Sequence, residues 1–252
     1  MKVINPKDPI RLARVFSYGA IGTGKTAFAA SWPRPMFLSD NLEQGHETVL
    51  NMDPDLFFEP GRYPEIHLIE SMKDMLEDLA KLEERIKNRP GDIQTLVVDS
   101  ATYYSQMIVD QLLRNPPRTK NGEINTLELY GNLAQHLRAV LTRAHALPIH
   151  VIWTAHDKVD QGRYGADIIG KAAGFIPGAC NYLLVHVKNA EGGFEVHTRG
   201  FEKFPGRGRD WGKLPDVIEP NYQVFAEHLG WLTPKKQVEQ ARQSMRPVTQ
   251  RR

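Results

Sequence analysis

The feature that most constrains this chain is a glycine-rich segment of eight residues that ends in Lys-Thr. It matches the pattern G-x-x-x-x-G-K-[ST] at every fixed position, and it lies between an apolar stretch at 14–18 and a helical stretch at 25–31. Glycines in such a loop let backbone N–H groups approach phosphate oxygens, and the helix that follows adds a favourable dipole. The pattern predicts a phosphate-binding loop made of Gly19, Ala20, Ile21, Gly22, Thr23, Gly24, Lys25 and Thr26.

Two residues of this loop and one downstream acid predict a nucleotide with its metal. Lys25 is expected to reach the β- and γ-phosphates of ATP, and the hydroxyl of Thr26 is expected to bind Mg²⁺. An apolar strand at 93–98 leads into Asp99, and an acid at the carboxyl end of a parallel strand can hold Mg²⁺ beside such a loop. The predicted cofactors are therefore ATP and Mg²⁺, with Thr26 and Asp99 as metal-binding residues.

Polar residues also follow two other predicted strands. Glu43 and Asp40 come at or just after the strand at 36–39, and either carboxylate could orient the attacking water. We favour Glu43 as the catalytic base and keep Asp40 as the alternative. His156 follows the strand at 149–153 and is a candidate sensor of the γ-phosphate, with an ordinary surface histidine as the alternative.

The order of the predicted elements indicates the fold class. Strands alternate with helices over the first two thirds of the chain, and the clearest helices, at 71–88 and 126–146, repeat apolar residues at helical spacing. Strands at 182–187 and 194–198 flank a Glu-Gly-Gly turn, which predicts a hairpin. We therefore expect an α/β fold with a mostly parallel sheet flanked by helices and an antiparallel hairpin at one edge.

Charge and hydropathy bear on organisation and location. We expect a core at 1–233 and a basic tail at 234–252, where six basic residues stand against one acid. Such a tail is typical of a nucleic-acid-binding arm, or simply of a solvated terminus. No apolar run approaches the roughly 20 residues of a membrane helix, and the first 14 residues lack a signal-peptide pattern. We expect a cytoplasmic protein, in the host cell if the source is a phage, without membrane contact.

Four segments together resemble the RecA-like core ATPases of bacteriophages, in particular the phage single-strand annealing recombination ATPases. The resemblance spans about residues 14–213. It implies a RecA-like P-loop core, and it gives Glu43 the place of the family's catalytic glutamate, although an extra residue separates Asp40 from Glu43. The segments are G-A-I-G-T-G-K-T, D-N-L-E-Q-G, T-L-V-V-D-S-A-T and W-T-A-H-D-K.

The same resemblance implies single-stranded DNA as a partner. The family binds single strands with two loops after the central strands, which would be residues 157–165 and 166–178 here. Basic and aromatic side chains in these segments could contact phosphates and stack on bases. An ordinary flexible loop or a substrate lid is the alternative. The candidate DNA-binding residues are Lys158, Arg163, Tyr164, Lys171 and Phe175.

The resemblance also implies a ring or filament of identical subunits. Arg207 and Arg209 are then candidates to reach a neighbour's nucleotide in trans, with a solvated basic turn as the alternative. The implied function is DNA-stimulated ATP hydrolysis by a recombination protein that anneals single strands, with a single-strand binding protein as a candidate partner. The alternatives are a helicase, a helicase loader, another replication ATPase, a binding module with negligible turnover, and a small-molecule kinase that uses residues 115–125 as its lid.

Overall fold

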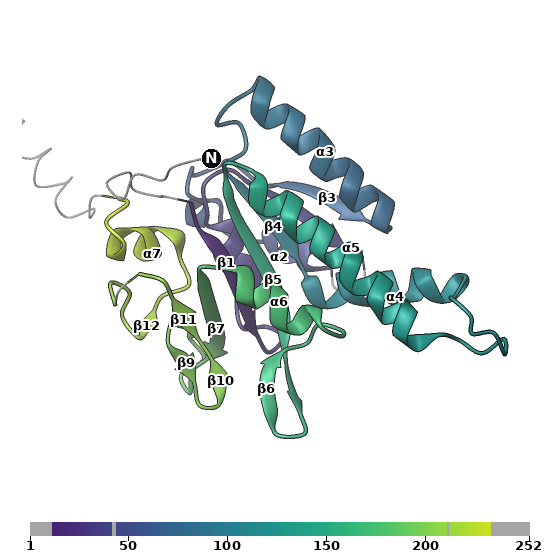
Figure 1. The fold of residues 1–252 in the computed structure, drawn as a ribbon. Coiled ribbons are helices and arrows are strands. Elements are labelled where there is room, and N and C mark those ends of the chain that lie inside the picture. The colour runs from purple at the N-terminus through teal and green to yellow at the C-terminus, as the bar shows by residue number, and fades with distance from the viewer. Residues whose placement is uncertain (1–11, 42–43, 211, 233–252) are drawn as a thin grey trace, which may run out of the picture.

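A mostly parallel sheet forms the centre of the structure, a computed structural model that describes residues 12–41, 44–210 and 212–232. Its main path has the order β12-β8-β7-β1-β5-β4-β2-β3 (Figure 1). The strands are β1 (Arg14–Gly19), β2 (Pro35–Asp40), β3 (Glu65–Ile69), β4 (Thr95–Asp99), β5 (His150–Asp160), β6 (Arg163–Ala166), β7 (Tyr182–Lys188), β8 (Phe194–His197), β9 (Gly200–Phe201), β10 (Phe204–Pro205), β11 (Arg207–Gly208) and β12 (Val217–Ile218).

The six strands from β7 to β3 on this path run parallel, and β8, β11 and β12 add antiparallel pairs at the β7 edge. β5 lies between β1 and β4, so the strand that leads into the glycine-rich loop does not touch the strand that ends at Asp99. Because the carboxyl ends of parallel strands meet at one edge, the ends of β1, β5, β4 and β2 lie together. The predicted fold class and edge hairpin are confirmed.

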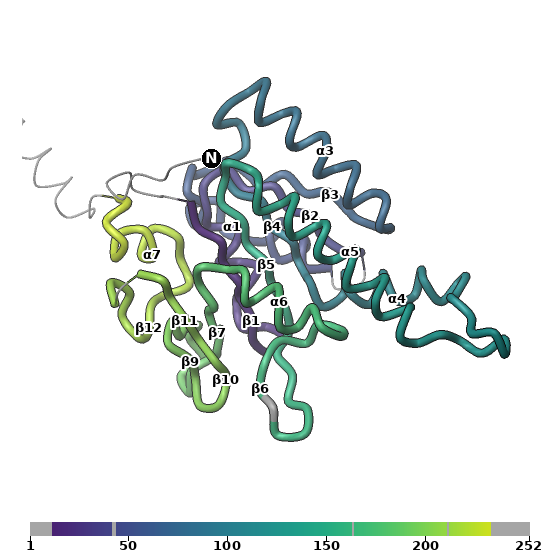
Figure 2. Tube along the Cα trace, in the orientation of Figure 1, coloured from purple at the N-terminus to yellow at the C-terminus, as the bar shows by residue number. Residues whose placement is uncertain are grey.

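Helices cover both faces of the sheet. Apolar residues of α3, α4, α5 and α6 pack on one face, and those of α1, α2 and α7 pack on the other. Figure 2 follows the same elements along the Cα trace, with α5 and α6 passing over the strands in this view. The helices are α1 (Lys25–Ala30), α2 (Gly45–Leu50), α3 (Met72–Asn88), α4 (Ala101–Arg114), α5 (Thr126–Ala146), α6 (Ala172–Ala179) and α7 (Tyr222–His228), with a short 3₁₀ turn at Pro54–Leu56.

The two cores follow from the alternation of side chains along each central strand. Phe16 and Leu38 belong to the core on the α5 face, whereas their neighbours Val15 and Phe37 belong to the core on the α1 face. All four side chains are buried. A strand buried on both faces reads as a continuous apolar run, which is why the sequence indicated these strands.

The long helices form where their periodicity predicted them. α3 begins one residue after Ser71, whose Oγ accepts a hydrogen bond of 3.1 Å from the backbone N of Asp74. Met75, Leu79 and Leu82 of this helix are buried against the sheet. Ser71 therefore caps the helix, and the apolar face of the helix is the buried one.

The region predicted as two DNA-binding loops is different. β5 continues past Trp153 to Asp160, turns at Gln161–Gly162 and pairs with β6. Both turn residues have positive φ, 50° and 76°, the geometry of a two-residue hairpin turn. The interpretation of residues 157–165 as a loop is wrong, because the backbone of this segment pairs with itself.

The second predicted loop, residues 166–178, contains most of α6. Ala172 and Ile176 of this helix are four residues apart, and both are buried in the core. Packing of this helical face outweighs the low helix propensity of Gly174 and Gly178, a cost of about 1 kcal/mol per glycine. The loop interpretation of this segment is also wrong.

Among the described residues, no helix is both long and apolar enough to cross a bilayer. The predicted tail at 234–252 lies outside the described residues, so the division of the chain into a core and a tail stays a prediction.

A buried histidine makes the fold sensitive to acid. His150 is 8% exposed, and its Nδ1 accepts a hydrogen bond of 3.0 Å from the backbone N of Ala13. Burial, together with the positive charge of Arg14, lowers the pKa of His150 from 6.5 to about 4. The unfolded chain therefore binds a proton more readily than the folded one below pH 6.5, and stability falls with falling pH.

We expect His150→Asn to flatten this acid dependence. The Asn oxygen can replace Nδ1 as acceptor without titrating, so between pH 7 and pH 5 the variant should lose about 1–2 kcal/mol less than the wild type. Urea unfolding across this pH range measures the difference. His228→Asn, at an exposed position of α7, serves as the control. Equal slopes for wild type and His150→Asn would contradict the assignment.

Candidate active site

The glycine-rich loop connects the end of β1 to the start of α1. Gly22 and Gly24 have φ of 76° and 84°, a conformation that other residues rarely adopt. The Nζ of Lys25 donates hydrogen bonds to the backbone oxygens of Gly19, at 2.9 Å, and Ala20, at 2.7 Å. The ammonium group is therefore held inside the curve of the loop, where phosphate oxygens would bind.

Asp99 connects this loop to the centre of the sheet. The carboxylate is 3% exposed, and the Oγ1 of Thr26 donates a hydrogen bond of 3.1 Å to its Oδ2. The predicted metal-binding residues therefore lie together, although 73 residues separate them in the chain. Hydroxyl and carboxylate oxygens are the ligands that Mg²⁺ prefers, so the pair fits that metal.

Thr154 is a site residue that the sequence analysis missed. Its hydroxyl donates a hydrogen bond to Oδ1 of Asp99, on the opposite side of the carboxylate from Thr26. Thr154 reaches this position because β5 lies between β1 and β4. Its role could have been predicted only from the order of strands in the sheet, and the spacing of apolar residues along the chain does not give that order.

Gly45 brings the segment after β2 against the same carboxylate. A Cβ at this position would lie 2.7 Å from Oδ2 of Asp99 and 3.6 Å from Oγ1 of Thr26. Asp40 ends β2 nearby, and its Oδ2 accepts a hydrogen bond of 3.4 Å from the backbone N of Ser100. Glu43 lies outside the described residues. The choice of catalytic base between Glu43 and Asp40 stays a prediction.

His156 lies at the same edge of the sheet. It pairs in register with Gly19 at the end of β1. Its backbone N donates a 2.9 Å hydrogen bond to Oγ1 of Thr102, and its ring meets Tyr103 edge-on with centroids 5.4 Å apart. The imidazole is 9% exposed, so an ordinary surface histidine is excluded. The position suits a γ-phosphate sensor, and that role stays a prediction.

A second buried histidine, His186, contacts the strand that leads into the loop. Nε2 of His186 hydrogen-bonds to Oγ of Ser17 in β1. Burial and the adjacent charge of Lys25 lower the pKa of His186 to about 3, so the ring is neutral at physiological pH. A neutral ring leaves the positive charge of Lys25 without a buried neighbour of the same sign.

Three of the side chains predicted to bind DNA, those of Lys158, Tyr164 and Phe175, have partners within the chain. Nζ of Lys158 forms a 3.3 Å ion pair with Asp167. The ring of Tyr164 meets Phe204 edge-on at 4.9 Å, and the guanidinium of Arg138 lies 5.1 Å from the ring centroid of Phe175. Lys171 is the N-cap residue of α6, and Arg163 belongs to β6. The structure thus divides the five predicted residues between a hairpin and a helix.

Arg207 has an intramolecular role that the sequence did not indicate. Its Nη2 donates hydrogen bonds to the backbone oxygens of Pro177, at 3.0 Å, and Cys180, at 3.1 Å. It therefore binds the carboxyl end of α6 in its own chain. Arg209 is exposed, and its backbone N donates a hydrogen bond to Asn181. A trans contribution by either arginine stays a prediction.

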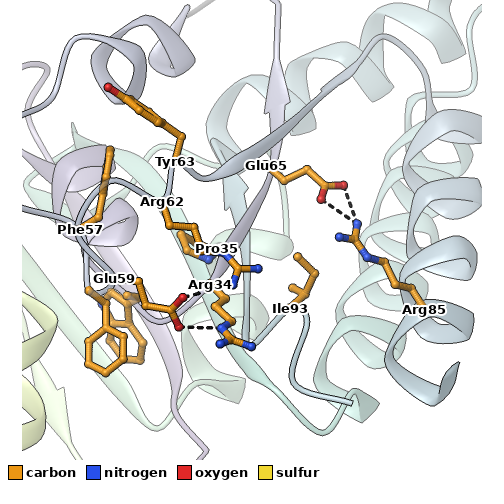
Figure 3. Close-up of a pocket in the computed structure, with 11 residues that line it drawn as sticks. Arg34, Pro35, Phe57, Glu59, Arg62, Tyr63, Glu65, Arg85 and Ile93 are labelled. Carbon is orange, nitrogen blue, oxygen red and sulfur yellow. Dashed lines mark hydrogen bonds and ion pairs between the residues drawn. The ribbon is translucent and has the colours of Figure 1, made fainter. Parts of the chain in front are cut away.

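A small cavity lies at the opposite edge of the sheet, where β2 begins. It has a volume of about 70 Å³, and Figure 3 shows the ion pairs along its wall. Arg34 pairs with Glu59 at 2.6 Å, and Arg85 pairs with Glu65 at 2.7 Å. Its arginines are neutralised and it is far from Lys25, so this cavity is separate from the phosphate-binding loop.

The loop at 115–125, which the kinase alternative uses as a lid, connects α4 to α5. An antiparallel bridge between Arg118 and Ile124 closes it. Figure 1 shows it at the outer ends of these helices, away from the carboxyl end of β1. This placement is wrong for a lid over the phosphate-binding loop.

Comparison with known proteins identifies a family. A family described as an AAA domain matches residues 11–183, more than half of the chain. No match is found among the curated proteins.

A solved structure with a TM-score above 0.5 shares the fold at low identity. An ATPase from the type III secretion system of pathogenic bacteria has a TM-score of 0.51 and 15% identity, covering 86% of this chain and 61% of its own. A KaiC-like protein of the hyperthermophilic archaeon Pyrococcus horikoshii has a TM-score of 0.41 and 18% identity, covering 73% and 77%. This chain spans less than two thirds of the secretion ATPase, and the likeness concerns the fold alone.

Gly45→Ala should disturb the metal site without unfolding the protein. The new Cβ would displace the Asp99 carboxylate, and we expect magnesium-dependent ATP hydrolysis to fall roughly 10- to 100-fold. Gly131→Ala is the matched control. Gly131 has open space around its Cα in the middle of α5, so this change should raise stability by about 0.5–1 kcal/mol and leave hydrolysis unchanged. Wild-type hydrolysis by Gly45→Ala would contradict the site.

Proposed function

Because the chain belongs to the AAA-domain family of ATPases, we propose that it is a P-loop ATPase that binds single-stranded DNA, hydrolyses ATP in response, and promotes strand annealing during recombination. ATP binding follows from the family and from the loop around Lys25. The DNA role is supported by the resemblance to phage annealing ATPases and by the path of β5. Assembly of several copies is part of the proposal.

At the nucleotide, Lys25 and the backbone N–H groups of its loop would bind the phosphate oxygens and neutralise charge on them. Thr26 and Asp99 would hold Mg²⁺, which supplies electrophilic stabilisation of the transferred phosphoryl group when bound. Thr154 keeps the Asp99 carboxylate in place through its hydrogen bond to Oδ1. These residues position the phosphates before any water attacks.

Hydrolysis also needs a carboxylate that orients the water. Asp40 and Glu43 are the candidates from the segment that ends β2, and Gly45 brings the continuation of that segment to Asp99. The reaction places a water hydroxyl on the γ-phosphorus, breaks the bond to the β-phosphate oxygen, and releases ADP and phosphate. The carboxylate accepts the proton that the water loses.

The observation that carries the DNA proposal is the continuity of β5. This strand contributes Thr154 and His156 to the nucleotide site, and it then extends without interruption into the hairpin with β6. A ligand that shifts the hairpin would therefore act on the same strand that touches Asp99. Such a connection is what DNA-stimulated hydrolysis requires.

Aromatic and basic side chains lie together beside this hairpin. The hairpin packs against β10 through Tyr164 and Phe204, and the Nζ of Lys203 lies 5.5 Å from the Tyr164 ring centroid. The segments 157–167 and 199–210 together contain six basic and five acidic residues, and two of the basic ones pair with Asp167 and Asp210. Aromatic and basic groups on one surface are typical of single-strand binding.

The central test measures ATP hydrolysis without nucleic acid, with single-stranded DNA and with duplex DNA. We expect single strands to stimulate hydrolysis more than duplex does, and Lys25→Ala to abolish it, because the variant lacks the cation that neutralises the phosphates. The Lys25→Ala protein also controls for contaminating ATPase. Hydrolysis that ignores DNA would contradict the DNA role but not the ATPase assignment. Unwinding without annealing would favour a helicase.

The hairpin can be tested through the salt dependence of binding. If Lys158 contacts one phosphate, Lys158→Ala should make the slope of log K against log salt shallower by about 0.7 for a single strand. Fluorescence anisotropy with an oligonucleotide measures the slope. Lys73→Ala, at a highly exposed position of α3, is the matched control and should leave the slope unchanged. If Lys158→Ala and the wild type give the same slope, Lys158 does not contact a phosphate, and the proposed role of the hairpin in DNA binding is contradicted.

A further inference from the structure

An exposed aromatic ring lies beside the phosphate-binding loop, and neither the motif nor the family accounts for it. Phe194 begins β8 and is 45% exposed. A Cβ built on Gly24 would lie 3.4 Å from Cγ of this ring, so the ring is in contact range of the loop backbone. Large apolar side chains on a surface lose the benefit of burial, and one at a ligand site calls for an explanation.

The hairpin that carries Phe194 is firmly held. β7 pairs in parallel with β1 over five residue pairs, and Phe194 lies opposite Lys188 in the β7–β8 ladder. Asn189 closes the turn, because its Oδ1 accepts hydrogen bonds from the backbone N of Glu191, at 3.1 Å, and Gly193, at 2.8 Å. The ring is therefore presented to the loop by a sheet strand rather than by a mobile segment.

The strands on either side of β1 indicate which end of a bound nucleotide would lie near Phe194. β5 and β7 flank β1 on opposite sides. Thr26 turns toward Asp99, which lies on the β5 side, so the metal and the terminal phosphates belong there. The base is at the other end of the nucleotide, so on this orientation it would extend toward β7 and β8.

We propose that Phe194 is the platform on which the base of the bound nucleotide stacks. A flat aromatic ring meets any heterocyclic base through its π-face, so the contact adds affinity without selecting one base. The Nζ of Lys188 lies 5.9 Å from the ring centroid and adds a positive charge on the same hairpin. The inference rests on ATP binding at Lys25 and is independent of the DNA role.

The test compares a ligand that has a base with one that lacks it. Isothermal titration measures Kd for ATP and for inorganic tripolyphosphate with wild type, Phe194→Ala and Phe194→Trp. We expect Phe194→Ala to weaken ATP about tenfold and to leave tripolyphosphate unchanged, and Phe194→Trp to keep the wild-type affinity for ATP. Phe58→Ala, which removes a ring 39% exposed beside the cavity at the start of β2, should change neither Kd.

The remaining outcomes separate this inference from the proposed function. Equal weakening of ATP and tripolyphosphate by Phe194→Ala would show that the ring only positions the loop, and unchanged ATP affinity would show that it does not touch the base. Either result overturns the platform. If the wild-type protein binds no ATP, the nucleotide site is overturned as well. If DNA does not stimulate hydrolysis but Phe194→Ala weakens ATP and not tripolyphosphate, the DNA role is overturned and the base platform is supported.

Discussion

The hydrogen bonds that converge on the Asp99 carboxylate hold the candidate site together. Thr26 donates to one carboxylate oxygen from the loop after β1, and Thr154 donates to the other from β5. Both contacts depend on β5 lying between β1 and β4. A different strand order would leave Asp99 buried without these donors, at a cost of several kcal/mol for an unpaired charge. The order of the strands therefore determines both the fold and the geometry of the candidate site.

The residues beneath the phosphate-binding loop place no second positive charge next to Lys25. Lys25 is the cation that the phosphates need, and a second positive charge under it would raise the free energy of the folded state. Ser17 gives His186 a hydrogen-bond partner, and burial keeps the ring neutral. The aromatic ring of Phe28 also packs on His186, with centroids 5.3 Å apart. The floor of the loop thus carries no second positive charge beneath Lys25.

The sequence predicted those parts of the site that depend on local pattern. Lys25, Thr26 and Asp99 are predictable because a strand, a glycine-rich turn and a helix occur in a fixed order around them. Thr154 and His186 are not predictable, because their roles arise from strands that are neighbours in space but far apart in the chain. The glycines at 162–178 suggested loops for a related reason, since strand pairing and burial decide that segment and neither is a local property.

The hydrogen bonds of Lys25 within its own loop have a consequence for ligand entry. The ammonium is already bonded to the backbone oxygens of Gly19 and Ala20, so an incoming anion meets a cation whose donors are partly engaged. A monovalent halide offers such a group a single point of contact. A chain of phosphates offers several oxygens at once and engages the backbone N–H groups as well. We therefore expect the resting loop to bind polyphosphates more tightly than small monovalent anions.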